Sequence, residues 1–263
     1  MTTAGRGVRS VEVGAHLLDV LAHHSEPLML RDLARKAGIA PAQAHTYLAS
    51  LRALDLVEQE PASSRYRLGP AALELGIARM RSIDPIRLAQ ATAVALSEET
   101  GLAVALVVWG SFGPTVIQVI EGPDQIHINT RAGTVYSLTG TASGRVFAAH
   151  LPEAMVEKAL ADEKRERGQT NRVGTPSALS KAERQRIRDL GFATVSPPPV
   201  PSVNALAAPV FDHAGQIQMT ITLIGAASML DNSEESAFLA PLSEAALTIS
   251  RGLGYEPAGD IAE

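Results

Sequence analysis

The chain has 263 residues, of which 46% are hydrophobic, and this is enough to build the cores of two domains. It contains no cysteine, so disulfides, cysteine–zinc sites and thiol nucleophiles are excluded. The formal net charge is −5, so any contact with nucleic acid has to come from locally placed basic side chains rather than from a basic protein as a whole.

The N-terminal residues lack the apolar core of a secretory signal peptide, and no stretch of the sequence is long and apolar enough to span a bilayer. Together with the lack of cysteine, this leads us to expect a cytoplasmic protein with no membrane partner. Residues 1–9 are expected to form a flexible arm in which Arg9 reaches a DNA groove, and an ordinary flexible terminus fits the sequence equally well.

A helix-turn-helix is the main pattern of residues 10–69. Ser10 is expected to cap a first helix, and a second helix is expected over 31–37 with Arg31 at its N-cap. Pro41 suits the first position of a third helix, because its missing N–H costs nothing there. One face of this third helix carries apolar residues at helical spacing, which predicts that they are buried. These residues are Ala44, Leu48, Leu51 and Leu54.

The opposite face of the third helix is small and polar and carries no acidic residue. A solvated helix face usually carries Glu and Lys, whereas amide, imidazole and hydroxyl groups suit the edges of bases in a major groove. We therefore expect this face to contact DNA. Its candidate residues are Ala42, Gln43, His45, Thr46 and Ser50.

Two short strands, over 56–59 and 66–68, follow the third helix and complete a winged helix-turn-helix. Arg65 and Arg67 share a face of this hairpin, where guanidinium groups suit phosphates or the minor groove, and Arg31 is a further phosphate candidate. The same pattern occurs in protein-interaction modules. Because residues 1–76 hold eight basic and eight acidic side chains, a protein partner for the wing remains an alternative.

At these residues the sequence resembles the IclR family of bacterial transcription regulators. The likeness extends over residues 10–254 and implies a GAF-like effector-binding fold for the C-terminal part, with operator DNA and a small-molecule effector as partners. The stretches that match, in the family's order, are 10–12, 33–38, His45, 48–51, 56–59 and 65–69.

Residues 70–84 are expected to form a linker helix that is apolar on more than one side and therefore needs a partner helix. The resemblance implies that this helix pairs two DNA-binding domains, giving a homodimer or a tetramer built as a dimer of dimers. An effector-binding and oligomerisation domain is expected over 85–256, with a flexible tail over 257–263.

The second domain shows helix and strand patterns around a mostly antiparallel sheet, which predicts an α+β fold. Helices are expected at 85–100, 142–150, 152–160, 181–190 and 232–253. Strands are expected at 102–109, 115–121, 125–130, 192–196, 205–211 and 216–224, and an exposed loop at 165–176.

No convincing catalytic or metal-binding set is present in the sequence. The histidines form no recognised metal spacing, and the serine of residues 140–144 is not in a nucleophile elbow, so we expect no enzyme activity, metal or cofactor. Thr139, Ser143 and Gly144 lie where a strand enters a helix, and N–H groups there suit a carboxylate. A tight, glycine-rich turn needed only by the backbone explains these residues equally well.

The resemblance implies an effector pocket formed by this loop and the inner faces of the last strands. Its candidate residues are Thr139, Ser143, Gly144, Val195, Ala205, Thr222 and Ile224. Trp109 is a further candidate, although a core position is more usual for a strand tryptophan. Family members that bind small carboxylates carry polar residues at three of these positions. In this sequence Val195 replaces an acidic residue, Ala205 replaces a cysteine and Ile224 replaces a serine, so the resemblance implies a more apolar pocket.

The sequence thus predicts a ligand-responsive, DNA-binding transcription regulator, in the form of a repressor of a catabolic operon. The expected effector is a small organic acid, with an aromatic acid or its ring-opened product favoured. The alternatives are a small-molecule-binding interaction module and an enzyme built on the C-terminal domain. An enzyme would need convergent titratable groups in the pocket, and the candidates there are mostly hydroxyl-bearing and apolar.

Overall fold

The computed structural model describes residues 7–122, 130–165 and 172–257. The chain divides between Ile83 and Asp84 into two compact units, which are described separately here. Most of the expected arm, residues 125–129 of an expected strand and residues 258–263 of the expected tail lie outside the described residues.

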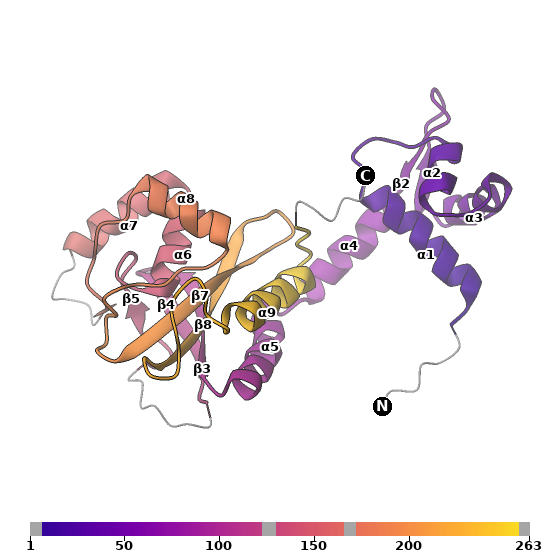
Figure 1. Cartoon of the computed structure of the whole chain (residues 1–263). Coiled ribbons are helices and arrows are strands. Elements are labelled where there is room, and N and C mark those ends of the chain that lie inside the picture. Colours follow the sequence, from indigo (N-terminus) through magenta and orange to yellow (C-terminus); the bar gives the residue numbers. More distant parts are fainter. Residues whose placement is uncertain (1–6, 123–129, 166–171, 258–263) are drawn as a thin grey trace. The chain divides into compact units, whose positions relative to one another are not determined.

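The N-terminal unit is a three-helix domain with a two-stranded wing, followed by one further helix (Figure 1). Its core consists of apolar side chains from the first three helices and both strands, and Leu17, Leu33 and Leu48 are completely or almost completely buried. The elements are α1 (Arg9–Ala22), α2 (Leu30–Lys36), α3 (Pro41–Ala53), β1 (Val57–Gln59), β2 (Tyr66–Leu68) and α4 (Pro70–Ser82).

The starts of the first two helices differ from the sequence predictions. The N-cap of α1 is Val8 rather than Ser10, and the N-cap of α2 is Met29 rather than Arg31, and neither cap residue makes a side-chain capping bond. The cap expected at Ser10 and the N-cap position expected for Arg31 were therefore wrong, because each helix begins before these residues. Burial of Leu54 was also wrong: this residue follows the last turn of α3 and is 63% exposed.

The C-terminal unit is a six-stranded sheet with helices on both faces (Figure 1). The strand order is β6-β5-β4-β3-β8-β7, and the pairs are antiparallel except for β5 with β6. The strands are β3 (Ala103–Gly110), β4 (Gly113–Ile120), β5 (Val135–Tyr136), β6 (Arg172–Val173), β7 (Val203–Phe211) and β8 (Ile217–Ala226).

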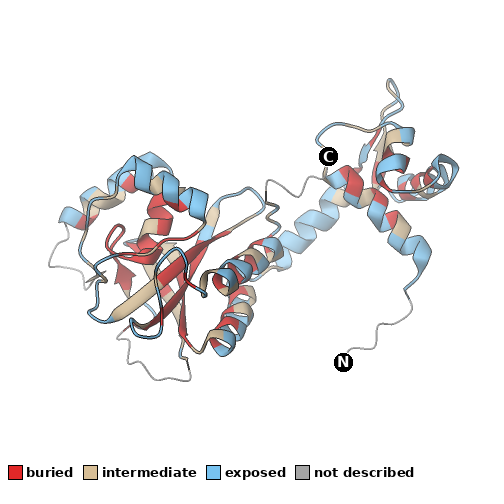
Figure 2. Cartoon of the chain, viewed as in Figure 1, coloured by how far each residue is buried: buried red, intermediate tan, exposed pale blue. Residues whose placement is uncertain are grey.

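Two groups of helices cover the sheet. Helices α5 (Pro85–Thr100) and α9 (Leu239–Gly252) pack on each other and on one face, while α6 (Ala142–His150), α7 (Glu153–Arg165) and α8 (Lys181–Leu190) lie on the other. Successive strand residues point to opposite faces, so the central strands are buried on both sides, as the red sheet in Figure 2 shows.

Helix ends in this unit follow local sequence signals. The Asp84 carboxylate accepts from the first-turn N–H groups of α5, at 3.1 Å each, and Gly101 ends that helix with φ of 71°. Ser180 and Glu183 form a reciprocal capping box at α8, and Gly191 ends it with φ of 75°. The predicted bounds of α5, α6 and α8 are therefore confirmed.

Other predicted elements are corrected by the structure. Helix α7 extends to Arg165, and part of the expected 165–176 loop is the strand β6, which pairs in parallel with β5. The last helix begins at Leu239 because residues 232–238 form turns. Of the expected strand 192–196, only a single bridge from Ala193 to Ala207 is present.

His150, at the C-terminal end of α6, is a largely buried histidine whose pKa the fold shifts. Its ring packs edge-on against Phe211 at a centroid distance of 5.0 Å, and its Nε2 atom is buried without a hydrogen-bond partner among the described residues. Burial, followed by the nearby Arg188 charge, lowers the pKa of His150 from 6.5 to about 4. The folded domain therefore holds this imidazole neutral.

We expect the C-terminal domain to lose stability on acidification through His150. Below pH 6.5 the His150 imidazole of the unfolded chain binds a proton that the folded domain binds only near pH 4, so the free energy of unfolding falls across this window. At 1.36 kcal/mol per pKa unit, the loss is about 2 kcal/mol between pH 7 and pH 5. Urea unfolding followed by Trp109 fluorescence measures this loss. The His150→Gln variant should show a shallower pH dependence, and identical profiles would contradict the assignment.

Candidate functional site

The polar face of α3 is presented to solvent as the sequence predicts. Ala42, Gln43, His45, Thr46 and Ser50 are all exposed. Two of these hydroxyl groups donate back to helix carbonyls, from Thr46 to Ala42 at 3.2 Å and from Ser50 to Thr46 at 3.3 Å. Gln43 and His45 make no side-chain hydrogen bond with the described residues, so their amide and imidazole groups are available to a partner.

The N-terminus of α3 is open as well. Its N-cap is Ala40, which has no side-chain capping bond, and Pro41 occupies the first turn. The backbone N–H groups of Ala42 and Gln43 therefore lack a protein acceptor from the cap and lie at an exposed helix end. The partial positive charge of such an end favours phosphate.

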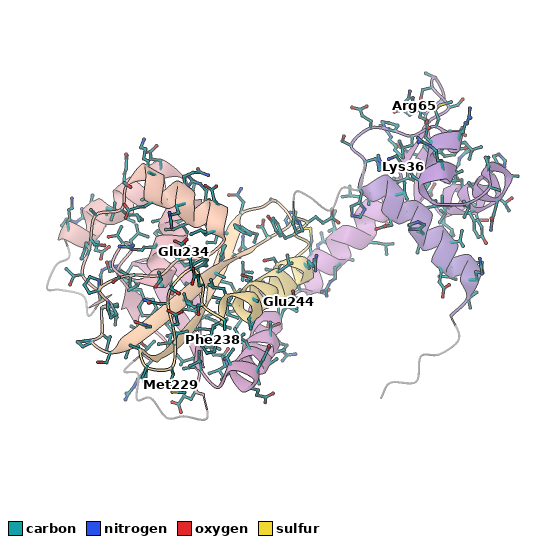
Figure 3. All side chains as sticks on the ribbon, in the orientation of Figure 1. Lys36, Arg65, Met229, Glu234, Phe238 and Glu244 are labelled. Carbon is teal, nitrogen blue, oxygen red and sulfur yellow. The ribbon has the colours of Figure 1, made fainter. Side chains whose placement is uncertain are left out.

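The wing is less basic than its arginines indicate. Glu58 lies directly opposite Arg67 in the β1–β2 pair, and Arg67 Nε donates to Glu58 Oε1 at 2.5 Å. The Nη1 atom of Arg67 lies 3.6 Å from Glu60 Oε1. Arg65, labelled in Figure 3, donates to the Pro27 carbonyl at 3.0 Å. Arg67 must therefore exchange or share its carboxylate partners to bind a phosphate.

Three further exposed cations of this domain have no such partner among the described residues. Arg9 and Arg31 form no ion pair or side-chain hydrogen bond with the described residues, in contrast to Arg35, which pairs with Asp32 at 3.0 Å. The same holds for Lys36 at the end of α2 (Figure 3), which our sequence analysis did not select. Its only signal was a position in the last turn of that helix.

A cavity of about 50 Å³ opens between the start of α6 and the inner face of the sheet. It brings together five of the eight candidate effector residues from elements that are distant in the sequence. These are Ser143, Val195, Ala205, Thr222 and Ile224.

A buried pair of hydroxyl groups joins the two sides of this cavity. Ser143 Oγ in α6 lies 2.9 Å from Thr222 Oγ1 in β8, and each side chain is almost completely buried. Thr141 caps α6 by accepting from the Gly144 N–H at 3.1 Å. The first turn of α6 thus faces the cavity with hydroxyl groups and a helix N-terminus.

Three candidates lie outside this cavity. Trp109 packs on Phe147 at a centroid distance of 5.7 Å and lines a different cavity. Thr139 accepts from the Ser177 N–H at 3.0 Å, so its hydroxyl holds a loop. Gly144 allows close packing, because a Cβ there would collide with the Ser137 carbonyl. Thr139 and Gly144 act on the cavity only by shaping its loop.

Several lining residues were not found from the sequence. Tyr136 donates its O–H to Thr130 Oγ1 at 3.4 Å, and burial raises the pKa of this phenol, so it stays neutral and its oxygen can still accept from a ligand. Tyr136 comes from a two-residue strand, and the others come from loops, strand ends and the first residue of α6, where no periodic pattern exists. The residues missed are Thr130, Tyr136, Thr141, Ala142, Val173, Pro199, Val200 and Val203.

The lining of this cavity lacks the titratable groups that acid–base catalysis needs. Its lining contains hydroxyl groups and apolar side chains, and no acid, base or histidine. Within the described ranges, no group of histidine and acidic residues is arranged to hold a metal ion. None of the described helices combines the length and apolarity needed to cross a membrane.

Comparison with known protein families covers nearly the whole chain. Residues 10–61 match the IclR helix-turn-helix domain, and residues 78–251 match the family described as "Bacterial transcriptional regulator IclR C-terminal". These two families consist of transcriptional regulators and not of enzymes.

Individual relatives match over their full length. The HTH-type transcriptional regulator XynR of Escherichia coli strain K12 is 28% identical, over 94% of this chain and 98% of its own. The glycerol operon regulatory protein of Streptomyces griseus is 30% identical, over 95% of this chain and 98% of its own.

The fold agrees with a solved structure. The crystal structure of Pseudomonas aeruginosa HmgR superposes with a TM-score of 0.85 at 32% identity, covering 95% of this chain and 100% of that one. The winged helix, the helix-flanked sheet and the two family matches lead to the same conclusion. The chain belongs to the IclR family and is a DNA-binding transcriptional regulator.

Proposed function

We propose that this regulator reads its operator with the outer face of α3, using Gln43, His45 and Thr46 at base edges. The observation that carries this proposal is an exposed, acid-free helix face whose first turn has no side-chain cap. Base edges are read by amide, imidazole and hydroxyl groups, and phosphates bind at uncapped helix ends. Arg9, Arg31 and the wing residues Arg65 and Arg67 then contact the DNA backbone.

Helix α4 supports an oligomeric form. None of its residues is buried, and Leu73 and Leu75 are 67% and 63% exposed, with Ile77 and Met80 also open to solvent (Figure 2). Apolar side chains gain free energy when a second helix covers them, at roughly 25 cal/mol per Å². We propose pairing of α4 between two copies, with the C-terminal domains joining dimers into a tetramer.

The proposed effector is an organic acid that binds in the cavity at the start of α6. An uncharged lining with hydroxyl groups and a helix N-terminus suits a carboxylate on an otherwise apolar molecule. The volume of about 50 Å³ is smaller than the roughly 150 Å³ that holds benzene, so an aromatic acid needs the exposed rim at Pro199 and Val200 to move outward.

For this regulator we propose a repressor role. The regulator occupies an operator at a catabolic operon in the cytoplasm, and the effector acid lowers the operator affinity. Such a change requires the effector to bind the DNA-bound and free forms with different affinities.

DNA binding is tested by gel shift on the region upstream of the protein's own coding sequence, over a salt series. Gln43→Ala should reduce the preference for that DNA over random duplex, because it removes a base contact worth about 1–3 kcal/mol. Arg31→Ala should weaken binding to both DNAs alike, because it removes a contact with the DNA backbone.

Arg165→Ala is the matched control. This exposed arginine lies in the C-terminal domain, away from the proposed DNA surface, and pairs there with Asp162. It should leave binding unchanged. If Gln43→Ala lost affinity equally for both DNAs, Gln43 would contact the DNA backbone rather than a base. If the unmodified protein retarded neither DNA at low salt, the proposal that this surface binds DNA would be refuted.

Effector binding is tested by titration calorimetry with pyruvate, benzoate and phenylacetate. Aromatic acids should bind more tightly than pyruvate, and Thr222→Val should weaken them about tenfold, because a buried hydroxyl partner is lost. Thr220→Val on the same strand is the control, because its buried hydroxyl has no partner in the described structure and lines no part of the cavity. Tighter binding of pyruvate would refute the aromatic effector.

A further inference from the structure

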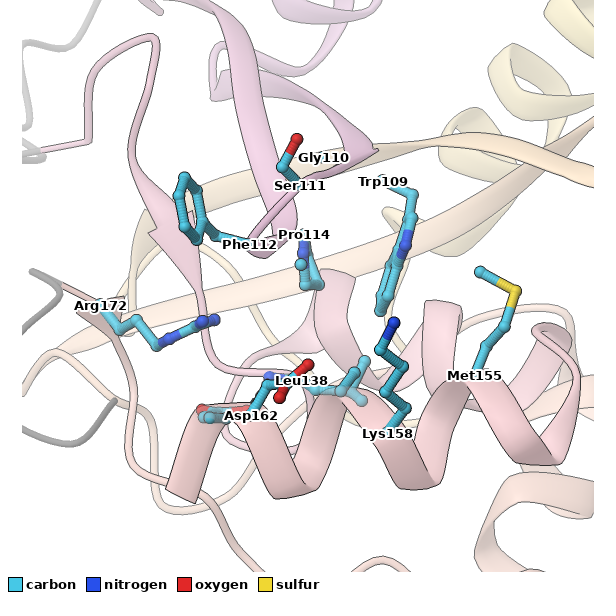
Figure 4. Close-up of a pocket in the computed structure, with 13 residues that line it drawn as sticks. Trp109, Gly110, Ser111, Phe112, Pro114, Leu138, Met155, Lys158, Asp162 and Arg172 are labelled. Carbon is cyan, nitrogen blue, oxygen red and sulfur yellow. Dashed lines mark hydrogen bonds between the residues drawn. The ribbon is translucent and has the colours of Figure 1, made fainter. Parts of the chain in front are cut away.

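A second cavity of the C-terminal domain shares no lining residue with the effector cavity. It has a volume of about 220 Å³ and lies between the tip of the β3–β4 hairpin and α7 (Figure 4). An apolar cavity of roughly 150 Å³ holds a benzene ring, so this one has room for a ring and a polar end group. Neither the family comparison nor the proposed effector site accounts for it.

A buried carboxylate at this cavity has one oxygen atom without a hydrogen-bond partner among the described residues. Glu163 is only 4% exposed and lines the cavity from α7. Its Oε2 atom accepts from the Leu138 N–H at 3.2 Å, whereas Oε1 is buried with no partner among the described residues. Leaving such an oxygen unpaired costs about 1–3 kcal/mol or more, which a donor group of a ligand would recover.

A cation without a partner lines the same cavity. Lys158 rises from α7 and its ammonium end points toward Trp109 in Figure 4, and it forms no ion pair with the described residues. The neighbouring Asp162 is already paired with Arg165 at 2.7 Å, so it does not neutralise Lys158. Arg172 also lines the cavity from β6 and adds to the positive charge there.

The remaining wall is apolar. The Trp109 ring is held against Phe147, and Pro114 and Met155 line the cavity on either side of it (Figure 4). Aromatic and thioether groups are good surfaces for an aromatic or large aliphatic side chain.

From these three features we propose that this cavity binds a free α-amino acid with a large apolar side chain. The ammonium group of the ligand donates to Glu163 Oε1, the carboxylate pairs with Lys158, and the side chain packs on Trp109. A buried acceptor and an unpaired cation in one cavity match a zwitterion, whereas a simple acid would leave Glu163 unpaired and a simple amine would leave Lys158 unpaired.

The experiment uses the full chain and the fluorescence of Trp109, which is the only tryptophan. The probes are L-phenylalanine and L-leucine, with phenylpropanoate and phenethylamine as analogues that lack the ammonium and the carboxylate. Both amino acids should give a saturating change, and each analogue should bind at least about tenfold more weakly than L-phenylalanine, because one charge-assisted hydrogen bond is missing.

Variants separate this cavity from the effector cavity. Lys158→Ala should weaken L-phenylalanine about tenfold and leave phenethylamine unchanged, while Lys164→Ala, an exposed lysine of α7 outside the cavity, should change neither. Glu163→Gln keeps an oxygen to accept from Leu138 and should weaken L-phenylalanine but not phenylpropanoate. Thr222→Val, in the effector cavity, should leave amino-acid binding intact.

The proposal is overturned by the absence of a saturating change with both amino acids. Equal affinities for L-phenylalanine and its two analogues would overturn it as well, as would unchanged binding in Lys158→Ala. Because Thr222→Val and operator binding are read separately, failure here leaves the proposed effector site and DNA surface untouched.

Discussion

The first turn of α6 is fixed to the sheet by the buried hydrogen bond between Ser143 and Thr222, and the shape of the proposed effector cavity depends on it. Two hydroxyl groups that bond to each other in the interior cost little to bury, and because their bond uses only one O–H hydrogen, the other stays free to donate to a ligand carboxylate. Thr141 caps the start of the same turn by accepting from the Gly144 N–H. A helix start held this firmly presents its N–H groups in one position, which reduces the entropy that ligand binding must overcome.

The helices could be predicted where local chemistry fixes their ends. Asp84 before α5 and Gly101 after it are a cap and a left-handed residue, and both ends were correct. The starts of α1 and α2 were misplaced because Val8 and Met29 precede them and make no side-chain capping bond. Without such a bond, only packing determines the first helical residue. Strands of two residues, such as β6, are too short to show alternation.

The candidate site was predicted only in part, for a related reason. The family resemblance selected Ser143, Thr222 and Ile224, which long-range strand pairing and helix packing bring together. Tyr136 was missed because its position follows from the pairing of β5 with β4 and β6, which no local pattern reports. Trp109 was correctly recognised as an aromatic strand residue, but the face on which it lies depends on strand register.

The glycines of the loop before α6 restrict how the proposed effector cavity can change. A Cβ at Gly140 or Gly144 would collide with neighbouring backbone oxygen atoms, so the loop that supports the start of α6 tolerates almost no side chain at these two positions. The opposite walls at Val195, Ala205 and Ile224 carry ordinary side chains, which can be exchanged at the modest cost of repacking. In the proposed effector site, new ligand preferences would therefore be acquired, in evolution or by engineering, at these three wall positions while the supporting loop stays constant.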